Sequence, residues 1–247
     1  MSVTLLLEVG NTAWKLAIYQ VADKPKFIGR GQGFAELETL LPTLDFDSLA
    51  VASVAANEFT EALRQFAAQH NKRLFVAETQ TGYDVTHCYA NPSTYGVDRW
   101  LTLLVARAEQ KNAMIIDAGT AVTLDVIDQE GRHLGGWISP GFRLMQESLV
   151  QRSSKLRVTD KAPEEALGTS TEYAVYLGCQ AALRGFVEQA LQRSEETFGT
   201  QGFICYLTGG DHGHISSELF NRFNCHLERR ADLVLEGLAR WFEQRPV

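Results

Sequence analysis

A short pattern that occurs twice constrains the fold more than any other feature of this sequence. Residues 6–12 and residues 115–121 each run from apolar positions through an acid and one further residue to a glycine and a small polar residue. The two acids, Glu8 and Asp117, are separated by 117 − 8 = 109 positions in a chain of 247 residues. Self-similarity at this spacing indicates two related structural units, and we place them at residues 1–111 and 112–247.

Apolar runs of strand length alternate along the chain with amphipathic segments of helix length. This alternation predicts an α/β fold, with mixed sheets flanked by helices. Residues 83–95 carry Asn, Pro and Ser, and we expect an irregular loop there. Strands are expected at residues 3–9, 14–19, 48–54, 73–76, 113–117, 121–127, 133–138 and 203–207. Helices are expected at residues 58–69, 98–108, 140–150, 172–193 and 231–242.

Composition narrows the function classes. Lys plus Arg number 23 and Asp plus Glu number 30, so the formal net charge is 23 − 30 = −7. Such an acidic chain lacks the electrostatic footprint of a protein that binds nucleic acid or an anionic membrane, and no apolar stretch is long enough to span a bilayer. The four cysteines form no Cys-x-x-Cys pair, and residues 1–15 lack the features of a signal peptide. We therefore expect a protein of the reducing cytoplasm.

The first copy of the pattern, Glu8-Val9-Gly10-Asn11-Thr12, fits a phosphate-binding turn. A glycine directly after a strand lets the backbone turn sharply and approach a ligand closely. Asn11 and Thr12 add side-chain donors to the N–H groups of the turn, and a concave set of such donors holds phosphate oxygens. Lys15, on the next strand, could add a positive charge. An ordinary β-hairpin with a solvent-facing Lys15 explains the same residues.

The second copy, Asp117-Ala118-Gly119-Thr120-Ala121, favours the phosphate-binding interpretation. Two such turns could hold the β- and γ-phosphates from opposite sides, while Glu8 and Asp117 hold cations that neutralise phosphate charge. This arrangement resembles the actin, sugar-kinase and heat-shock ATPase superfamily, which has two ribonuclease-H-like lobes with a nucleotide cleft between them. Thr208-Gly209-Gly210-Asp211 matches the turn at which that superfamily admits adenosine. Alone, it is also typical of a strand-to-helix turn with Asp211 as the N-cap.

The segment from Tyr89 to Trp100 carries the strongest catalytic candidates. In Gly96-Val97-Asp98-Arg99 an acid and an arginine open a predicted helix just after a glycine. Asp98 could accept a proton from a substrate hydroxyl. Arg99 could bind a carboxylate or a phosphate with its planar guanidinium. A capped helix with an exposed ion pair is the plainer interpretation of these residues taken alone.

Six motifs appear in order along nearly the whole chain, and on this ordered set the chain resembles type III pantothenate kinase. The motifs are Glu8-Val-Gly-Asn-Thr-x-x-Lys15, Gly96-Val-Asp-Arg99, Asp117-Ala-Gly-Thr-Ala121, Gly135-Gly-Trp-Ile-Ser-Pro-Gly141, Gly168-Thr-Ser-Thr171 and Thr208-Gly-Gly-Asp211. The resemblance implies ATP-dependent phosphorylation of the pantothenate 4′-hydroxyl, the first committed step towards coenzyme A.

The resemblance also implies a role for each matching residue. Asp98 matches the general base, and Asp117 matches the ligand of the potassium or ammonium ion that the family requires. ATP contacts are expected at Glu8, Val9, Gly10, Asn11, Thr12, Ala13, Trp14, Lys15, Thr120, Gly209 and Gly210. Pantothenate contacts are expected at Tyr89, Gly96, Val97, Asp98, Arg99 and Thr171. Family members are dimers that build the pantothenate pocket at the subunit interface, so a homodimer is expected here.

Glu8 departs from the family, which usually has Asp at this position. Glu is one methylene longer, so its carboxylate reaches further. It could still bind the magnesium that accompanies ATP through water, or it could position the metal less well. Two alternatives stay open beside pantothenate phosphorylation. One is a kinase of the same fold for another small hydroxy acid or sugar, and the other is a non-catalytic nucleotide-binding regulatory protein.

The histidines offer no competing metal site. Their spacing along the chain matches no metal-ligand motif. His212 and His214 flank Gly213 beside the adenosine turn, and we expect them to be solvent-exposed loop residues.

Overall fold

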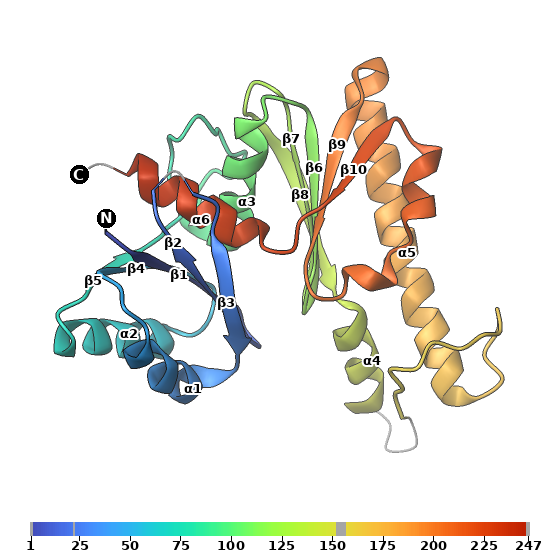
Figure 1. Cartoon of the computed structure of the whole chain (residues 1–247). Helices are drawn as coiled ribbons and strands as arrows, with labels where there is room; N and C mark the ends of the chain where they lie inside the picture. Colours follow the sequence, from blue (N-terminus) through green and yellow to red (C-terminus); the bar gives the residue numbers. More distant parts are fainter. Residues whose placement is uncertain (1, 22, 152–156, 246–247) are drawn as a thin grey trace. The chain divides into compact units, whose positions relative to one another are not determined.

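The structure is a computed structural model that describes residues 2–21, 23–151 and 157–245. It contains two five-stranded sheets with helices on their faces (Figure 1). The first sheet has the order β3-β2-β1-β4-β5, and the second has the order β10-β9-β6-β7-β8. In both, the first and second strands are antiparallel, whereas the first and fourth and the fourth and fifth are parallel. The repeat in the sequence is therefore a repeat of the fold, and the predicted α/β class with mixed sheets is confirmed.

The first sheet is covered by helices on both faces. Its strands are β1 (Thr4–Val9), β2 (Trp14–Tyr19), β3 (Lys26–Gly31), β4 (Ser48–Ser53) and β5 (Arg73–Val76). On one face α1 (Gly33–Leu40) and α2 (Asn57–Gln69) bring Leu37 and Leu63 against Leu5 and Leu7 of β1. On the other face α3 (Val97–Ala108) and α6 (Leu233–Gln244) pack on each other and contact β4, and α6 also contacts β1. Burial on both faces explains why β1 is almost continuously apolar.

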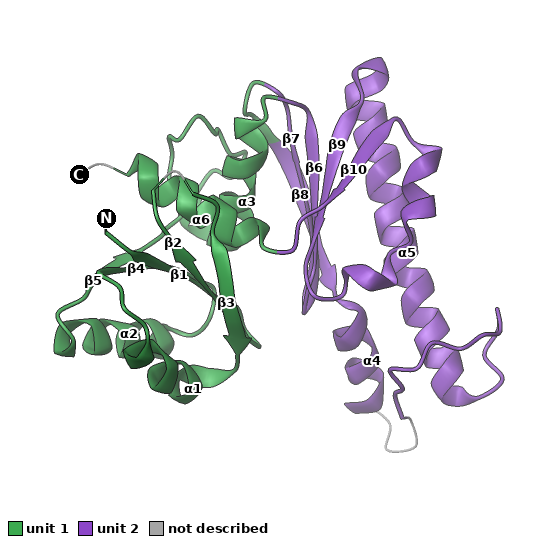
Figure 2. Ribbon diagram, viewed as in Figure 1, with its two compact units in different colours: residues 1–110, 130–133, 232–247 green, residues 111–129, 134–231 purple. Residues whose placement is uncertain are grey.

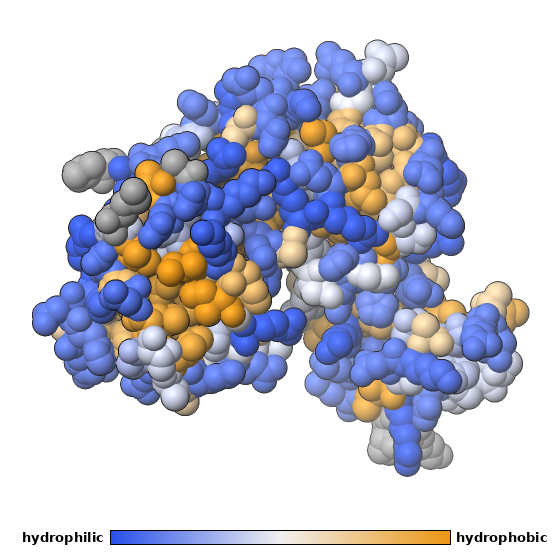
Figure 3. Space-filling model, viewed as in Figure 1, coloured by the Kyte–Doolittle hydropathy of each residue, from blue (hydrophilic) through white to orange (hydrophobic). Residues whose placement is uncertain are grey.

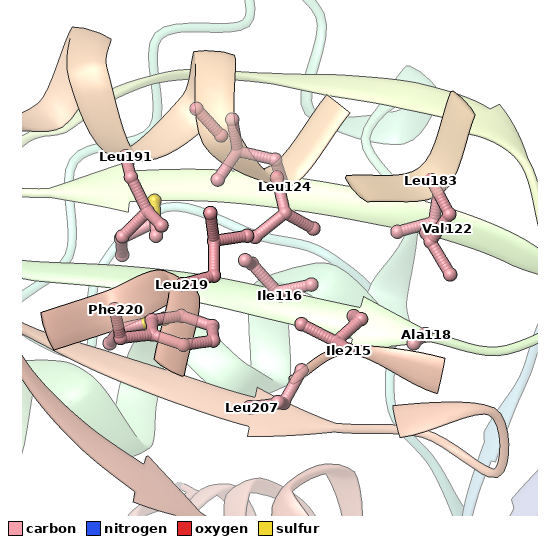
Figure 4. Close-up of a cluster of buried hydrophobic side chains, with 14 of the residues drawn as sticks. Ile116, Ala118, Val122, Leu124, Leu183, Leu191, Leu207, Ile215, Leu219 and Phe220 are labelled. Atoms are coloured by element: carbon pink, nitrogen blue, oxygen red, sulfur yellow. The ribbon is translucent and has the colours of Figure 1, made fainter. Parts of the chain in front are cut away.

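The second sheet packs against a long helix. Its strands are β6 (Ala113–Ala118), β7 (Ala121–Ile127), β8 (His133–Pro140), β9 (Phe203–Thr208) and β10 (Cys225–Arg229). The helical segments beside it include α4 (Phe142–Gln151), α5 (Thr171–Phe198) and the 3-10 segments η4 (His212–His214) and η5 (Ser217–Arg222). Figure 4 shows Leu191 of α5 and Leu219 of η5 gathered with Ile116 and Leu124 of the strands in one apolar cluster.

The chain divides into two compact units (Figure 2). Unit 1 comprises residues 1–110, 130–133 and 232–247, and unit 2 comprises residues 111–129 and 134–231. The boundary expected at residues 111–112 separates the two sheets, but the C-terminal helix α6 lies with the first sheet. The reason is its apolar surface, because most residues of α6 are buried, and these side chains pack on α3 and the first sheet.

The sequence does not predict β3, α1 or β10. The strands β3 and β10 lie at the edges of their sheets, and their residues are exposed or half-buried. An edge strand with little buried surface lacks the apolar alternation that reveals a strand in the sequence. The helix α1 has 8 residues, of which one, Leu37, is buried. Such a short stretch carries too few turns for a helical period to show.

Hydrophilic residues cover most of the visible surface, with smaller apolar areas between them (Figure 3). The exposed large apolar side chains of unit 2 include three on β8 and two on α4: Leu134, Trp137, Ile138, Leu144 and Leu149. Within residues 2–21, 23–151 and 157–245, no helix is both long enough and apolar enough to cross a membrane.

The packing of α6 on α3 depends on a glycine. A Cβ at Gly237 would lie 2.2 Å from the carbonyl oxygen of Leu101. We expect Gly237→Ala to lower the free energy of unfolding by about 1–3 kcal/mol, the usual cost of overpacking, as measured by urea titration. Gly185→Ala on α5 is the matched control, because nothing lies within 4 Å of the added Cβ there. Its better helix propensity should raise stability by about 0.5–1 kcal/mol. Equal effects in the two variants would contradict the close contact.

Candidate active site

The turn between β1 and β2 places an acid and a lysine side by side. Glu8 and Lys15 are direct partners in the antiparallel pair, so their side chains leave the same face of the sheet. Nζ of Lys15 lies 3.4 Å from Oε2 of Glu8, which is an ion pair rather than a close hydrogen bond. The N–H of Gly10 donates to the carbonyl of Ala13 at 3.0 Å and closes the turn. Its exposed tip therefore stands next to a half-buried ion pair.

Glu8 lies on the face of the first sheet that α3 and α6 cover. Strand residues alternate between faces, and Leu7 and Val9 join the cluster on the opposite face. Burial raises the pKa of Glu8, the positive charge of Lys15 opposes this rise, and the charges of Asp98 and Asp232 add to it. Oε2 of Glu8 is buried and accepts no hydrogen bond from the described residues. The ammonium of Lys15, 3.4 Å from this oxygen, offsets part of its lost hydration.

The start of α3 brings Asp98 to this turn. Gly96 is the N-cap of α3, and Asp98 lies in the first turn, where the partial positive charge of the helix end favours a carboxylate. Oδ1 of Asp98 accepts a hydrogen bond from the backbone N–H of Arg99 at 2.8 Å. A Cβ at Gly96 would lie 2.6 Å from that oxygen, so the glycine makes room for the carboxylate. Because the charge of Asp98 acts on Glu8, the two acids are neighbours within unit 1.

Arg99 is 6% exposed and lies among aromatic rings. We call Arg99, Tyr89, Tyr95 and His133 the Arg99 cluster. The guanidinium of Arg99 lies over the ring of Tyr95 at 4.9 Å and donates to the hydroxyl of Tyr89 at 3.2 Å. The ring of His133 stacks on that of Tyr95, with centroids 5.0 Å apart and planes 23° apart. A guanidinium held in one orientation is suited to recognising a planar anion such as a carboxylate.

Unit 2 repeats the strand–acid–turn arrangement at its own sheet. Asp117 is the next-to-last residue of β6, as Glu8 is of β1. The N–H of Gly119 donates to the carbonyl of Ala121 at 3.0 Å, and the N–H of Gly141 donates to the carbonyl of Thr120 at 2.9 Å. A Cβ at Gly141 would lie 2.0 Å from the carbonyl oxygen of Gly119. The segment that leads into α4 is thus packed directly on the β6–β7 turn.

The glycine pair after β9 packs on the same turn. Gly209 has a φ of +92°, and a Cβ there would lie 2.4 Å both from the carbonyl carbon of Ala118 and from Oδ1 of Asp117. Glycine is therefore required twice, for its dihedral angle and for the close approach. The N–H of Asp211 donates to the carbonyl of Ala118 at 2.8 Å. Three motifs that are far apart in the sequence converge in unit 2.

Comparison with known proteins agrees with this geometry. A family model described as type III pantothenate kinase matches residues 4–193. The type III pantothenate kinase of Idiomarina loihiensis is 34% identical over 256 residues, which cover 95% of this chain and 96% of that protein. That of Pseudoalteromonas atlantica is 31% identical over 245 residues, which cover 96% of each chain. The chain belongs to the type III pantothenate kinase family.

Solved structures share the fold of this family member. A Baf family protein from Campylobacter jejuni matches with a TM-score of 0.63 at 20% identity, covering 97% of this chain and 98% of that chain. The ethanolamine utilization protein EutJ from Carboxydothermus hydrogenoformans matches with a TM-score of 0.51 at 14% identity, covering 98% and 90%. Inorganic polyphosphate/ATP-glucomannokinase from Arthrobacter matches with a TM-score of 0.50 at 13% identity, covering 97% of each chain. At these identities the likeness concerns the fold alone, and it agrees with the expected fold class.

Some residues that the family resemblance assigns to ligands have buried side chains. Val9 and Trp14 are each 2% exposed, and Nε1 of Trp14 donates to the carbonyl of Gly33 at 3.0 Å. These two side chains belong to the core, which leaves the backbone for any contact with ATP. Thr171 is the exposed first residue of α5, in unit 2.

The expectation that His212 and His214 are solvent-exposed loop residues is wrong. Both are half-buried. Nδ1 of His212 lies 2.7 Å from the carbonyl oxygen of Gly209. The ring of His214 stacks on Phe142 of α4, with centroids 3.9 Å apart. The two histidines thus pack against the glycine turn and α4. No sequence pattern reveals these contacts, because the partners come from other segments.

Sequence analysis misses three residues of the site: Tyr95, His133 and Asp232. Tyr95 directly precedes Gly96, so its place beside a motif is a usable signal. His133 is the first residue of β8, and Asp232 is the N-cap of α6. No local pattern marks either residue, because only the fold brings them into unit 1.

The donor atoms of the family site suit hard cations. Among the described residues no group of three or more His, Cys, Asp or Glu side chains forms a metal site. The carboxylate of Glu8 faces the ammonium of Lys15 at 3.4 Å, and its oxygens are of the type that a hydrated magnesium ion accepts. Asp117 lies directly before the β6–β7 turn, whose backbone supplies carbonyl oxygens and N–H groups. Carboxylate and carbonyl oxygens are the ligands that such cations prefer.

The raised pKa of Glu8 has a consequence for stability. A folded-state pKa above the unfolded value contributes stability at low pH, and that contribution is lost as the pH rises through the folded-state pKa. We therefore expect Glu8→Gln to raise Tm at neutral pH, with the gain disappearing below about pH 4.3, the ordinary pKa of glutamate. Thermal melts across this range, with chelator present, measure the effect. Glu61→Gln on the exposed face of α2 is the control, and an unchanged or lower Tm for Glu8→Gln at neutral pH would contradict the burial argument.

Proposed function

We propose that this chain transfers the γ-phosphate of ATP to the 4′-hydroxyl of pantothenate, giving 4′-phosphopantothenate for coenzyme A biosynthesis. One observation carries the proposal: Asp98, Arg99 and the Glu8–Lys15 turn lie together in unit 1 of a type III pantothenate kinase family member. A proton acceptor, an anion-binding guanidinium and a phosphate-type turn are the parts needed to position an alcohol against a phosphoryl group.

In this proposal the carboxylate of pantothenate binds at the Arg99 cluster. The guanidinium of Arg99 already touches Tyr89 and Tyr95, so it is held where it can pair with a carboxylate rather than follow a moving phosphoryl group. The hydroxyl of Tyr89 can donate to the same anion. The other substrate contacts are Gly96, Val97, Asp98 and Thr171.

ATP is assigned to both turns. In unit 1, phosphate oxygens are bound by the backbone of residues 9–14, the donors of Asn11 and Thr12 and the charge of Lys15. In unit 2, the family resemblance assigns a phosphate contact to Thr120. The nucleoside lies at Gly209 and Gly210. A groove of about 500 Å³ runs beside the following segment η4. Its wall combines apolar and polar side chains, as a nucleoside requires: Leu177, Ala181, Arg184, His214 and Ile215.

Two cations complete the proposal. Glu8 would hold the magnesium that accompanies ATP, and Asp117 would hold potassium or ammonium. When bound, these ions neutralise the charge of the triphosphate. The chain's own residues carry out the transfer. Asp98 accepts the proton of the 4′-hydroxyl while the hydroxyl oxygen bonds to the γ-phosphorus and ADP leaves. The positive charge of Lys15 offsets the negative charge of the transferring phosphoryl group.

We also propose a cytoplasmic homodimer, as in the family. The support is the exposed apolar face of the edge strand β8, where alternation places Leu134 (46% exposed) and Ile138 (64% exposed) on the same side. An edge strand with exposed apolar side chains is a typical place for a second chain to associate.

Removing the proposed base tests the mechanism. We expect Asp98→Asn to lower kcat on the order of 10²-fold or more, because an amide cannot accept the proton, while ATP binding persists. The measurement is coupled detection of ADP formation with and without pantothenate, with potassium and magnesium present. Asp45→Asn, which alters an exposed carboxylate of unit 1, should leave kcat unchanged. Full activity of Asp98→Asn would remove Asp98 from the role of base, and ATP consumption that ignores pantothenate would overturn the proposed reaction.

Monovalent salts test the role of Asp117. If this carboxylate holds a potassium-sized ion, replacing potassium by sodium lowers the rate of the wild-type enzyme. Asp117→Asn should be slow in both salts, on the order of 10²-fold below wild type in potassium, the usual loss when one electrostatic stabiliser is removed. Wild-type rates that are equal in the two salts would contradict a specific site.

A further inference from the structure

A strained turn precedes the Arg99 cluster. Residues 82–85 form a tight turn in which the N–H of Val85 donates to the carbonyl of Gly82 at 3.2 Å. The two central residues, Tyr83 and Asp84, both have a φ of +56°. Positive φ at both central positions is the signature of a type I′ turn, which strongly prefers Asn-Gly. Aspartate is one of the few residues besides glycine that tolerate positive φ, but tyrosine does not favour this conformation by itself.

Contacts with α3 hold the turn in its unfavourable conformation. Nε of Arg107 donates to the carbonyl oxygen of Asp84 at 3.0 Å. The ring of Tyr83 packs edge-on against Trp100, with centroids 5.5 Å apart and planes at 87°. The β7–β8 hairpin contacts the turn from the other side. A Cβ at Gly131 would lie 2.3 Å from the same carbonyl oxygen, so the two backbones are in close contact. Strain that survives in a folded protein must be imposed by its surroundings in this way.

The turn leads directly to a proposed substrate contact. After it, the N–H of Thr86 donates to the carbonyl of Gly131, and the N–H of His133 donates to the carbonyl of Thr86, both at 2.9 Å. Tyr89 follows three residues later and meets Arg99 at 3.2 Å. The helix α3 therefore fixes both ends of this segment, with Arg107 at the turn and Arg99 at Tyr89.

We propose that Arg107 is a positioning residue for the substrate: it holds the Tyr83–Asp84 turn in the type I′ form and thereby sets the place of Tyr89 in the Arg99 cluster. Arg107 comes eight residues after Arg99, about 12 Å along the helix axis, so it acts through the turn and not by contact. The inference rests on the proposed function, since it assigns Tyr89 to pantothenate.

Loss of the guanidinium donor should weaken pantothenate binding selectively. We expect Arg107→Met to raise KM for pantothenate about tenfold, because small displacements of a positioning group are costly, with kcat and KM for ATP unchanged. Arg64→Met on the exposed face of α2 is the matched control and should alter none of these constants.

A rescue variant separates the turn from any other role of Arg107. Glycine is the favoured residue at the second central position of a type I′ turn, so Asp84→Gly makes the turn favourable without help from α3. We expect Asp84→Gly alone to raise Tm by about 2–4 °C and to leave KM unchanged. In the double variant Arg107→Met/Asp84→Gly, KM for pantothenate should return close to the wild-type value. An Arg107 that acted through its charge would show no such rescue. A general loss of stability would instead alter kcat and KM for ATP as well, which are expected to stay unchanged.

Hydrogen exchange provides a readout that does not depend on activity. In Arg107→Met the amides of Val85 and Thr86 should exchange faster than in wild type, and in the double variant their protection should return. If Arg107→Met is too unstable to assay, Asp84→Val replaces it, since a β-branched residue opposes positive φ and should raise KM in the same way.

The outcomes are distinguishable. An unchanged KM for pantothenate in Arg107→Met, or a failure of Asp84→Gly to restore it, overturns the inference. A wild-type enzyme that does not phosphorylate pantothenate overturns the proposed function instead. In that case the exchange measurements still decide whether Arg107 holds the turn.

Discussion

A carboxylate buried beside a single lysine sets the conditions for the whole site. The β1–β2 pairing puts Glu8 opposite Lys15, and strand alternation turns both towards α3 and α6. There Asp98 and Asp232 add negative charge to the surroundings of Glu8. The three acids outnumber the two cationic side chains of the site, Lys15 and Arg99, so the protein alone offers a triphosphate little net attraction. A phosphate-binding role for this turn is therefore coherent only if cations enter with the nucleotide, so the need for cations follows from the charge balance of the protein.

The helix α3 fixes the positions of the charged side chains of the site. Its residues from Arg99 to Ala106 are buried without interruption, so the helix is fixed on all sides. From that base it presents Asp98 at its N-terminus, anchors Tyr89 through Arg99 and braces the Tyr83–Asp84 turn through Trp100 and Arg107. Catalytic groups placed on a rigid element keep their relative positions, which is the main requirement of phosphoryl transfer.

The sequence is informative where a pattern is local and less so where partners are distant. The strand–acid–glycine repeat predicts two related sheets, because each copy is complete within seven residues and the alternating core positions follow it. The edge strands β3 and β10 are missed because they bury little surface. The docking of α6 beside β1, the stacking of His133 on Tyr95 and the closeness of Asp232 to Glu8 depend on contacts between segments far apart in the chain. Their residue types are ordinary, so no spacing rule reveals them.

Several features of the site run against stability, and they share a location. The ionised form of Glu8 is disfavoured by burial, and Tyr83 adopts a positive φ that residues other than Gly, Asn and Asp rarely take. Both departures lie in unit 1, one on the strand beside Asp98 and the other on the segment that leads to Tyr89. An unfavourable charge or backbone conformation persists where the surrounding structure enforces it and where function benefits from it. A Glu in place of the shorter acid fits this view, because its extra methylene places the buried charge further from the strand while the ion pair with Lys15 still holds it.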